Sequence, residues 1–340
     1  MRKNVRGLAV FLAAAIIGSV FLTGCSMDGD SNSSSGAEPK SANIDKDTGK
    51  AKADTNDGKG LQIAYCVHDL TNTYFVTLAK GLTETAEAQG MEVTIQDAKM
   101  DVATQISNIE NFIVQKKDAI FITPVDEKAL TDVVKKATDA GIPVISMNLE
   151  IPGRDAFITP NEYAFGEAGG KIAGEWIKKN LADEKDAKVV LFTAPEQPSL
   201  SERIRGLKEG CLNIAPGAKV IAEQGAITTE AGMAAAETIL QAHPDANVII
   251  CNNDSSALGA YEAFKAANKT DVCIVGLDAT PEAVNKIKEG GNYVGTVDID
   301  PYGTGVLAIE TLQKVIKDGP IEEPVYVNLI PVTSENIDQY

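Results

Sequence analysis

From Gly60 onward, short apolar runs rich in β-branched residues alternate with longer stretches of helical spacing. The runs are Leu61–Val67, Met91–Ile95, Ala119–Ile122, Pro143–Met147, Val189–Phe192, Val220–Ala222, Val248–Cys251, Val272–Val275 and Tyr293–Val297. Most of them are continuously apolar, which is typical of parallel strands covered on both faces. The alternation predicts a doubly wound α/β fold with right-handed crossovers.

The number of strand–helix units predicts two similar lobes instead of one sheet. The strand pattern restarts near Val189, after a long helical stretch at Phe165–Asn180, and 340 residues suffice for two cores. Within that stretch a glycine recurs every four residues, at Gly166, Gly170 and Gly174. No Gly-Lys-Ser/Thr follows, so the spacing predicts a small face for close packing and not a phosphate loop.

The N-terminus has the pattern of an export signal. Basic residues at positions 2, 3 and 6 precede an apolar run from Leu8 to Leu22, too short to span a bilayer. The run ends in Leu22-Thr23-Gly24-Cys25, which resembles a bacterial lipoprotein signal. The resemblance implies that residues 1–24 are removed and that Cys25 is lipidated; an ordinary secretory signal and an uncleaved anchor are the alternatives. Polar, Ser- and Asp-rich residues 25–59 predict a flexible tether.

The charge and the rare residues exclude several classes of function. Lys and Arg number 31 against 48 Asp and Glu, giving a net charge of −17, which disfavours nucleic acid as a partner. Two His and no paired Cys motif offer little for a metal or haem site, and no cofactor is predicted. Cys66, Cys211, Cys251 and Cys273 are scattered without a framework, which favours free buried thiols.

Polar residues follow several of the predicted strands. They are His68-Asp69-Leu70-Thr71-Asn72, Thr123-Pro124, Asn148, Asn252-Asn253-Asp254 and Leu277-Asp278. Ligands of open α/β sheets bind outside the carboxyl ends of the strands, and Asn and Asp suit a neutral ligand with many hydroxyl groups. Each residue could instead cap a helix or close a turn, and for Asp254 capping is the preferred interpretation.

Several motifs together resemble the periplasmic sugar-binding proteins of the ribose and glucose/galactose type. They are Asn72-Thr73-Tyr74-Phe75, Ile142-Pro143-Val144-Ile145, Ala242-His243-Pro244-Asp245, Asn252-Asn253-Asp254, Ala257-Leu258-Gly259-Ala260 and Val275-Gly276-Leu277-Asp278-Ala279-Thr280-Pro281. The resemblance extends from Gly60 to Tyr340. It implies an N-terminal lobe of residues 60–161 plus 300–328 and a C-terminal lobe of residues 162–299 plus 329–340. Three segments, near Asn161, Ile299 and Asn328, would join them.

The same resemblance implies a set of ligand-binding residues. Asn72 matches a hydrogen-bonding position of the first lobe, Tyr74 and Phe75 match aromatic positions against the sugar, and Asn148 matches an Asn of the glucose/galactose type. In the second lobe Arg203, Asn253 and Asp278 match polar contacts. His68 and Tyr163 are candidates for the rim of the site. The sequence departs from its relatives at Leu149, Ile227, Leu277 and Ile299, so the identity of the sugar is left open.

The resemblance implies a lipid-anchored, monomeric solute-binding protein on the outer face of the cell membrane. It would capture a ribose-, glucose- or galactose-like monosaccharide and deliver it to an ABC permease. A sensor subunit that presents the bound sugar to a receptor kinase or chemoreceptor is the alternative. An enzyme is disfavoured, because the chain has no G-x-S-x-G, H-E-x-x-H, P-loop or C-x-x-C motif.

Overall fold

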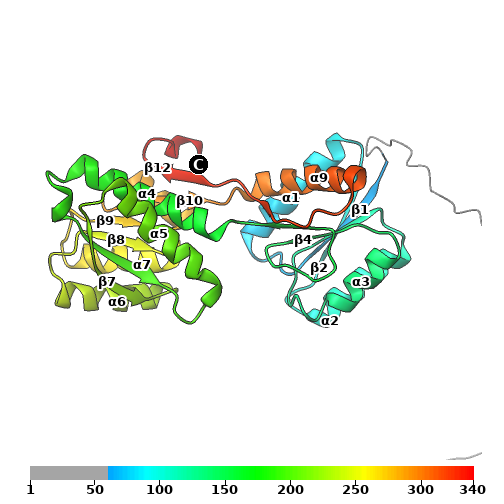
Figure 1. The fold of residues 1–340 in the computed structure, drawn as a ribbon, viewed down its shortest axis with the longest axis horizontal. Helices are drawn as coiled ribbons and strands as arrows, with labels where there is room; N and C mark the ends of the chain where they lie inside the picture. The colour runs from blue at the N-terminus through cyan, green and yellow to red at the C-terminus, as the bar shows by residue number, and fades with distance from the viewer. Residues whose placement is uncertain (1–59) are drawn as a thin grey trace, which may run out of the picture. The chain divides into compact units, whose positions relative to one another are not determined.

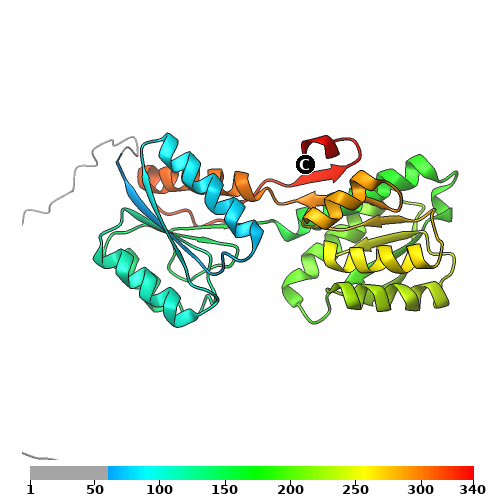
Figure 2. The same ribbon diagram turned by 180° about the vertical axis from the view of Figure 1, so that it is seen from behind.

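The computed structural model describes residues 60–340, so the signal sequence, the tether and Cys25 lie outside the described residues. The described chain forms two parallel-sheet α/β lobes, each with helices on both faces of its sheet (Figures 1 and 2). The predicted fold class is confirmed.

The chain begins in the first lobe, continues through the second, and then returns. The first passage forms β1 (Gln62–Val67), α1 (Thr73–Ala88), β2 (Glu92–Asp97), α2 (Val102–Val114), β3 (Ala119–Ile122), α3 (Thr131–Asp139), β4 (Val144–Met147) and β5 (Ala156–Thr159). The second lobe contains α4 (Glu162–Asn180), β6 (Lys188–Thr193), α5 (Ser201–Ile214), β7 (Lys219–Gly225), α6 (Thr229–Ala242), β8 (Val248–Cys251), α7 (Asp254–Ala266), β9 (Cys273–Val275), α8 (Pro281–Glu289) and β10 (Tyr293–Asp298). The last passage forms α9 (Pro301–Asp318) and β11 (Val325–Tyr326) in the first lobe and β12 (Ile330–Thr333) in the second.

The two sheets repeat one topology. Their strand orders are β11-β5-β4-β3-β1-β2 and β12-β10-β9-β8-β6-β7. All neighbouring strands pair in parallel except β12, which runs antiparallel to β10. The chain therefore passes from one sheet to the other three times: between β5 and α4, between β10 and α9, and between β11 and β12.

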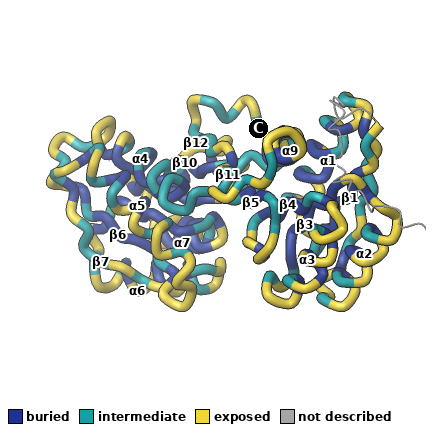
Figure 3. The backbone as a smooth tube through the Cα atoms, turned by 45° about the vertical axis from the view of Figure 1, so that its right-hand side comes forward, coloured by how far each residue is buried: buried dark blue, intermediate teal, exposed yellow. Residues whose placement is uncertain are grey.

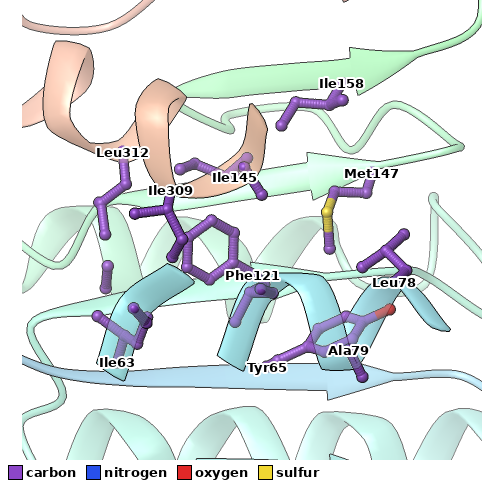
Figure 4. Close-up of a cluster of buried hydrophobic side chains, with 14 of the residues drawn as sticks. Ile63, Tyr65, Leu78, Ala79, Phe121, Ile145, Met147, Ile158, Ile309 and Leu312 are labelled. Atoms are coloured by element: carbon purple, nitrogen blue, oxygen red, sulfur yellow. The ribbon is translucent and has the colours of Figure 1, made fainter. Parts of the chain in front are cut away.

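Each sheet separates two apolar clusters, because successive side chains of a strand point to opposite faces. In the first lobe, Ile63 and Tyr65 of β1 face α1 and α9, whereas Ala64 and Cys66 face α2 and α3. Figure 4 shows the cluster under α1 and α9, where Phe121 and Ile145 from neighbouring strands meet the helix residues. In the second lobe one face packs against α4 and α5, and the other against α6, α7 and α8.

Burial follows the position of a strand in its sheet. Every residue of β3, β4, β8 and β9 is buried, whereas β2 and β7 at the sheet edges are partly exposed (Figure 3). This is why the central strands read as continuous apolar runs. The short strands β5, β11 and β12 were not among the predicted runs.

The predicted small face is also confirmed. A Cβ at Gly166 would overlap the Arg203 carbonyl group of α5, and one at Gly206 of α5 would overlap the Tyr163 carbonyl group of α4. Glycines on both helices thus bring the two backbones together. Gly81 of α1 and Gly305 of α9 make the corresponding approach in the first lobe.

None of the helices in the part of the chain that the structure describes combines the length and apolar character needed to cross a bilayer.

Candidate functional site

An aromatic group follows β1 in the first lobe. Asn72 is the N-cap of α1, where its side-chain Oδ1 accepts a hydrogen bond from the Tyr74 backbone N–H at 2.9 Å. The buried Phe75 ring lies 4.2 Å from the His68 ring and 4.8 Å from the Tyr74 ring, centroid to centroid, and meets both edge to face. The first turn of α1 therefore holds the His68, Tyr74 and Phe75 rings in one group, next to the exposed side-chain amide of Asn72.

Burial shifts the pKa values of the two ionisable residues of this group, His68 and Tyr74. It lowers the pKa of His68 and raises that of Tyr74 to about 12, although side-chain hydrogen bonds with Asn148 and Thr304 oppose the Tyr74 shift. Both side chains are thus neutral at neutral pH. The buried His68 Nδ1 has no hydrogen-bond partner among the described residues.

Asn148 follows β4 and has a φ of +70°, in the left-handed region that Asn tolerates better than most residues. Its side chain is half-buried, whereas that of the next residue, Leu149, is 47% exposed. Asn148 lies near enough to Tyr74 to lower the pKa of its hydroxyl group, whereas Leu149 faces solvent. Thr123, which follows β3, instead accepts from the His68 backbone N–H and hydrogen bonds with the Tyr65 hydroxyl, so it is a buried structural residue.

Arg203 is held by several contacts within the second lobe. Its Nε and Nη2 donate to Glu162 Oε2 and Oε1 at 2.6 and 3.1 Å, and Nη1 donates to the Asn252 carbonyl oxygen at 3.1 Å. The guanidinium also lies over the Phe165 ring, 4.7 Å from its centroid. Arg205 instead makes exposed pairs with Glu202 and Glu209, the acidic residues that the sequence also places near Arg203. The ion pair of Arg203 with Glu162 is therefore largely buried, unlike the exposed pairs of Arg205.

The three polar residues after β8 have three different roles. Asn252 is buried, and its Nδ2 donates to the carbonyl oxygens of Phe192 and Ala226. Asn253 is the N-cap of α7, where its Oδ1 accepts from the Ser256 backbone N–H while its Nδ2 donates to the Ile227 carbonyl oxygen. The preferred interpretation of Asp254 as the cap is wrong.

Asp254 is instead the centre of a buried network. Its Oδ1 accepts from the hydroxyl groups of Tyr293 and Thr296 at 2.8 and 2.7 Å, and its Oδ2 accepts from the Thr280 backbone N–H at 2.7 Å. The residue has no exposed surface. Burial raises the pKa of Asp254 to about 6, against the effect of these hydrogen bonds.

Asp278 follows β9 and reaches solvent, although the surrounding protein desolvates it. Desolvation raises the pKa of Asp278 to about 7, the neighbouring Asp254 carboxylate adds to the shift, and the Arg203 guanidinium opposes it. Asp278 is therefore an accessible carboxyl group with a raised pKa, and groups with perturbed pKa values cluster at functional sites.

Each lobe thus gathers its own predicted residues at the carboxyl ends of its strands. Asn72, Tyr74, Phe75 and Asn148 follow β1 and β4 in the first lobe, and Arg203, Asn253 and Asp278 lie after β6, β8 and β9 in the second. The sequence prediction missed Glu162, whose carboxylate orients Arg203. Its only signal was its place in the first turn of a helix, 41 residues before the arginine.

Two further features bear on the chemistry. Within residues 60–340, no group of three or more His, Cys, Asp or Glu side chains is placed to hold a metal ion. A pocket of about 360 Å³ lies between Trp176 of α4, the start of β10 and the end of β12, and contains none of the predicted site residues.

Comparison with known proteins places the chain among binding proteins. The sequence profile of the periplasmic binding protein domain matches residues 63–320. The ribose import binding protein of Bacillus subtilis is 31% identical over 271 residues, which cover 78% of this chain and 85% of that protein. The ribose import binding protein of Escherichia coli is 30% identical over 269 residues, or 78% of this chain and 88% of that protein.

Solved structures agree with these relatives. A periplasmic solute-binding protein of an ABC transporter from Actinobacillus succinogenes, with bound D-allose, is 28% identical with a TM-score of 0.66, covering 82% of this chain and 100% of that one. The myo-inositol binding protein of Caulobacter, bound to myo-inositol, is 29% identical with a TM-score of 0.60, covering 82% of this chain and 95% of that one.

Proposed function

Since this chain belongs to the periplasmic binding protein family, and to its sugar-binding members of the ribose type, we propose that it captures one monosaccharide and delivers it to an ABC importer. The binding residues that we propose are Asn72, Tyr74, Phe75 and Asn148 of the first lobe and Arg203, Asn253 and Asp278 of the second. Nothing in this role requires a cofactor, since the site binds its ligand and makes or breaks no covalent bond.

The observation that carries the proposal is the way Arg203 is held. A guanidinium has five N–H groups, and three of those of Arg203 are taken by Glu162 and the Asn252 carbonyl oxygen. One N–H on Nη1 and one on Nη2 are left for a ligand. Two donors in a fixed plane suit two neighbouring hydroxyl oxygens of a sugar.

The charge of the second-lobe residues favours a neutral ligand. Glu162 and Asp278 lie close to Arg203, so its positive charge is already compensated. A sugar phosphate would bring further negative charge to two carboxylates, which costs free energy. Asn253 contributes less than the sequence suggests, because both ends of its side-chain amide are used within the lobe.

The aromatic group of the first lobe supports a ring-shaped ligand. Tyr74 and Phe75 offer apolar surface, and the Asn72 and Asn148 side chains offer polar atoms beside it. Relatives are named for ribose, D-allose and myo-inositol, each a small polyhydroxylated molecule. We therefore propose a ribose-, glucose- or galactose-like sugar, with Leu149 and Ile227 restricting the choice.

The proposed mechanism is closure of two lobes on one sugar. The lobes consist of residues 60–161 plus 300–328 and residues 162–299 plus 329–340, joined near Asn161, Ile299 and Asn328. A ligand favours the closed form only through contacts that it makes with both lobes. The permease would then recognise the closed form.

We further propose that the mature protein begins at Cys25 and is anchored by lipid on the outer face of the membrane. The support is the short apolar run that ends in Leu22-Thr23-Gly24-Cys25. A single tethered chain can present its lobes to the permease, so a monomer is sufficient for this role.

A thermal-shift and calorimetric screen tests the proposed function. The ligands are D-ribose, D-allose, D-glucose, D-galactose and myo-inositol, with ribose 5-phosphate and amino acids as the contrasting classes. A true ligand at 100 times its Kd stabilises the protein by about 2.7 kcal/mol. Binding of a phosphorylated sugar or an amino acid alone would overturn the proposal.

A further inference from the structure

The turn that carries Asp278 has an unfavourable backbone conformation. Asp278 has a φ of +111° and Ala279 a φ of +50°, so two consecutive residues with side chains occupy the left-handed region. Non-glycine residues adopt such angles only where surrounding contacts impose them. The contacts that impose this turn should therefore determine where the Asp278 carboxylate lies.

The Asp278 backbone N–H donates to the Val297 carbonyl oxygen of β10 at 2.9 Å, and the other contacts come from Asp254 and one of its partners. Asp254 accepts from the Thr280 backbone N–H through Oδ2, and its own backbone N–H donates to the Leu277 carbonyl oxygen at 2.7 Å. Thr296 donates to Asp254 Oδ1 and accepts from the Ala279 backbone N–H at 3.1 Å. Asp254 thus holds the turn directly on both sides of Asp278, and a third time through the Thr296 hydroxyl.

The network is closely packed against the strand that leads into the turn. A Cβ at Gly276, just before the turn, would overlap Asp254 Oδ1 and the Tyr293 hydroxyl oxygen. Asp254 is also not needed to cap its own helix, because Asn253 caps α7. A buried carboxylate without solvent contact costs free energy, and that of Asp254 does not cap a helix. Within residues 60–340, its two oxygens accept only from Thr280 in the turn and from Tyr293 and Thr296 of β10.

We propose that Asp254 is a positioning residue for ligand binding, which acts by holding the Leu277–Thr280 turn and so placing Asp278 against the sugar. This inference rests on the proposed function, because it takes Asp278 as a ligand contact. Asp254 itself does not touch the ligand.

Two isosteric variants test the inference. In Asp254→Asn the amide cannot accept at both ends, so either the Thr280 N–H loses its acceptor or the Thr296 hydroxyl must accept twice. Thr296→Val removes the link to Ala279. Tyr293→Phe is the matched control, since it removes a buried hydrogen bond to the same Asp254 oxygen but none that the backbone of residues 277–280 makes. Thr296→Ser restores the hydroxyl and should rescue the wild-type behaviour.

Amide hydrogen exchange measured by NMR reads the turn without any ligand. We expect exchange of the Asp278, Ala279 and Thr280 amides to be about tenfold faster or more in Asp254→Asn and Thr296→Val. The α7 amides should be unchanged, and Tyr293→Phe should behave as wild type. Equal acceleration in Asp254→Asn and Tyr293→Phe would mean that Asp254 stabilises the lobe generally, which would overturn the inference.

Calorimetric titration with D-ribose, D-allose and myo-inositol measures how the variants change Kd. Asp254→Asn should raise Kd about tenfold in an otherwise wild-type chain and have no effect in an Asp278→Ala background, because it acts through that carboxylate. Additive effects would overturn the inference. If the wild-type protein binds none of these probes, the assignment to these sugars fails, and hydrogen exchange alone then decides whether Asp254 holds the turn.

Discussion

Gly170 of α4 lies against Leu207 of α5 so closely that a Cβ at residue 170 would overlap the Leu207 carbonyl oxygen and lie 2.8 Å from the Cys211 backbone nitrogen. Neither backbone can move without separating the two helices. Gly169, its neighbour, faces a different environment: a Cβ there would meet the Leu277 and Leu207 Cδ2 atoms at 2.8 and 3.1 Å. These are the free ends of flexible side chains.

We therefore expect different results from two adjacent substitutions. Gly→Ala in a helix gains about 1 kcal/mol of helix propensity, which offsets the small cost of displacing the Leu277 and Leu207 side chains, so Gly169→Ala should change stability little. Gly170→Ala should destabilise the protein by about 1–3 kcal/mol, because overpacking against backbone cannot relax. Urea unfolding of both variants checks this, and equal midpoints would contradict the assignment of the glycine face.

Arg203→Ala should be the most damaging single change for sugar binding. The substitution removes the two free N–H donors and leaves Glu162 unpaired in a half-buried position. We expect Kd to rise roughly ten- to a hundredfold, or about 1.5–3 kcal/mol. Arg205→Ala is the control, because its pairs with Glu202 and Glu209 are exposed and surface pairs contribute about 0–1 kcal/mol. Calorimetry that gives equal Kd values for the two variants would remove Arg203 from the site.

Sugar affinity should depend on pH through Asp278. Its pKa is raised from 3.8 to about 7, and an ionised carboxylate accepts stronger hydrogen bonds from hydroxyl groups, on both oxygens, than the protonated form does. At pH 6 only about a tenth of such groups are ionised, so Kd should be about tenfold weaker at pH 6 than at pH 8. Asp278→Asn should bind with no such dependence. His68 does not account for the change above pH 6.5, because burial lowers its pKa from that value.

The same shift has a consequence for the unliganded protein. Between pH 4 and 7 the folded state keeps a proton on Asp278 that the unfolded chain releases, so the contribution of this group to stability falls as the pH rises. Asp254, with a pKa of about 6, acts in the same direction up to that pH. Thermal unfolding of Asp278→Asn should therefore show a smaller loss of stability from pH 5 to 7 than the wild type, and an identical slope would argue against the raised pKa.

The four buried thiols should be unreactive in the folded protein. Cys66, Cys211, Cys251 and Cys273 are all free, and burial raises the pKa of each, to about 12 for Cys66 and Cys211. Because the thiolate is the reactive species, a disulfide reagent such as DTNB should label them only after denaturation. A Cys25→Ser chain keeps the N-terminal thiol out of the measurement. Rapid labelling of the native protein would show that one of these strands opens readily.

Replacement of Cys25 by Ser should release the protein from the membrane. Leu22–Cys25 follows an apolar run too short to span the bilayer, so the lipid on Cys25 would be the anchor. Fractionation of expressing cells, with metabolic labelling by palmitate, measures both the location and the lipid. A Cys25→Ser protein that stays in the membrane at mature length and still carries lipid would contradict the lipoprotein assignment.

The central architecture was predictable because burial leaves a direct mark on the sequence. Ala119–Ile122 and Val248–Cys251 were predicted with their observed bounds, since strands covered on both faces contain no polar residue. Strands at or near the sheet edges leave a weaker mark. β11 has only two residues, and β12 contains Pro331, which an edge strand tolerates. β5 has four mostly buried residues, and nothing in its sequence explains why it was missed.

The site was predictable to the level of strand ends but not of single roles. Asn252, Asn253 and Asp254 are consecutive and polar, yet their roles differ. Asn252 donates to backbone carbonyl groups, Asn253 caps α7, and Asp254 accepts from the Thr280 N–H of the next turn. Which role each residue takes depends on the direction in which α7 begins. The pairing of Glu162 with Arg203 depends on the packing of α4 on α5, which no local pattern encodes.

The order in which the strands are joined has a consequence for the newly made chain. Neither sheet is contiguous in sequence: the first ends with β11 and the second with β12, and both are the last strands to be synthesised. Until these residues emerge, β5 and β10 each present a row of unpaired backbone groups, a template on which chains aggregate. Export of the chain before it folds would therefore let both edges close at the same moment, in the compartment where the protein works.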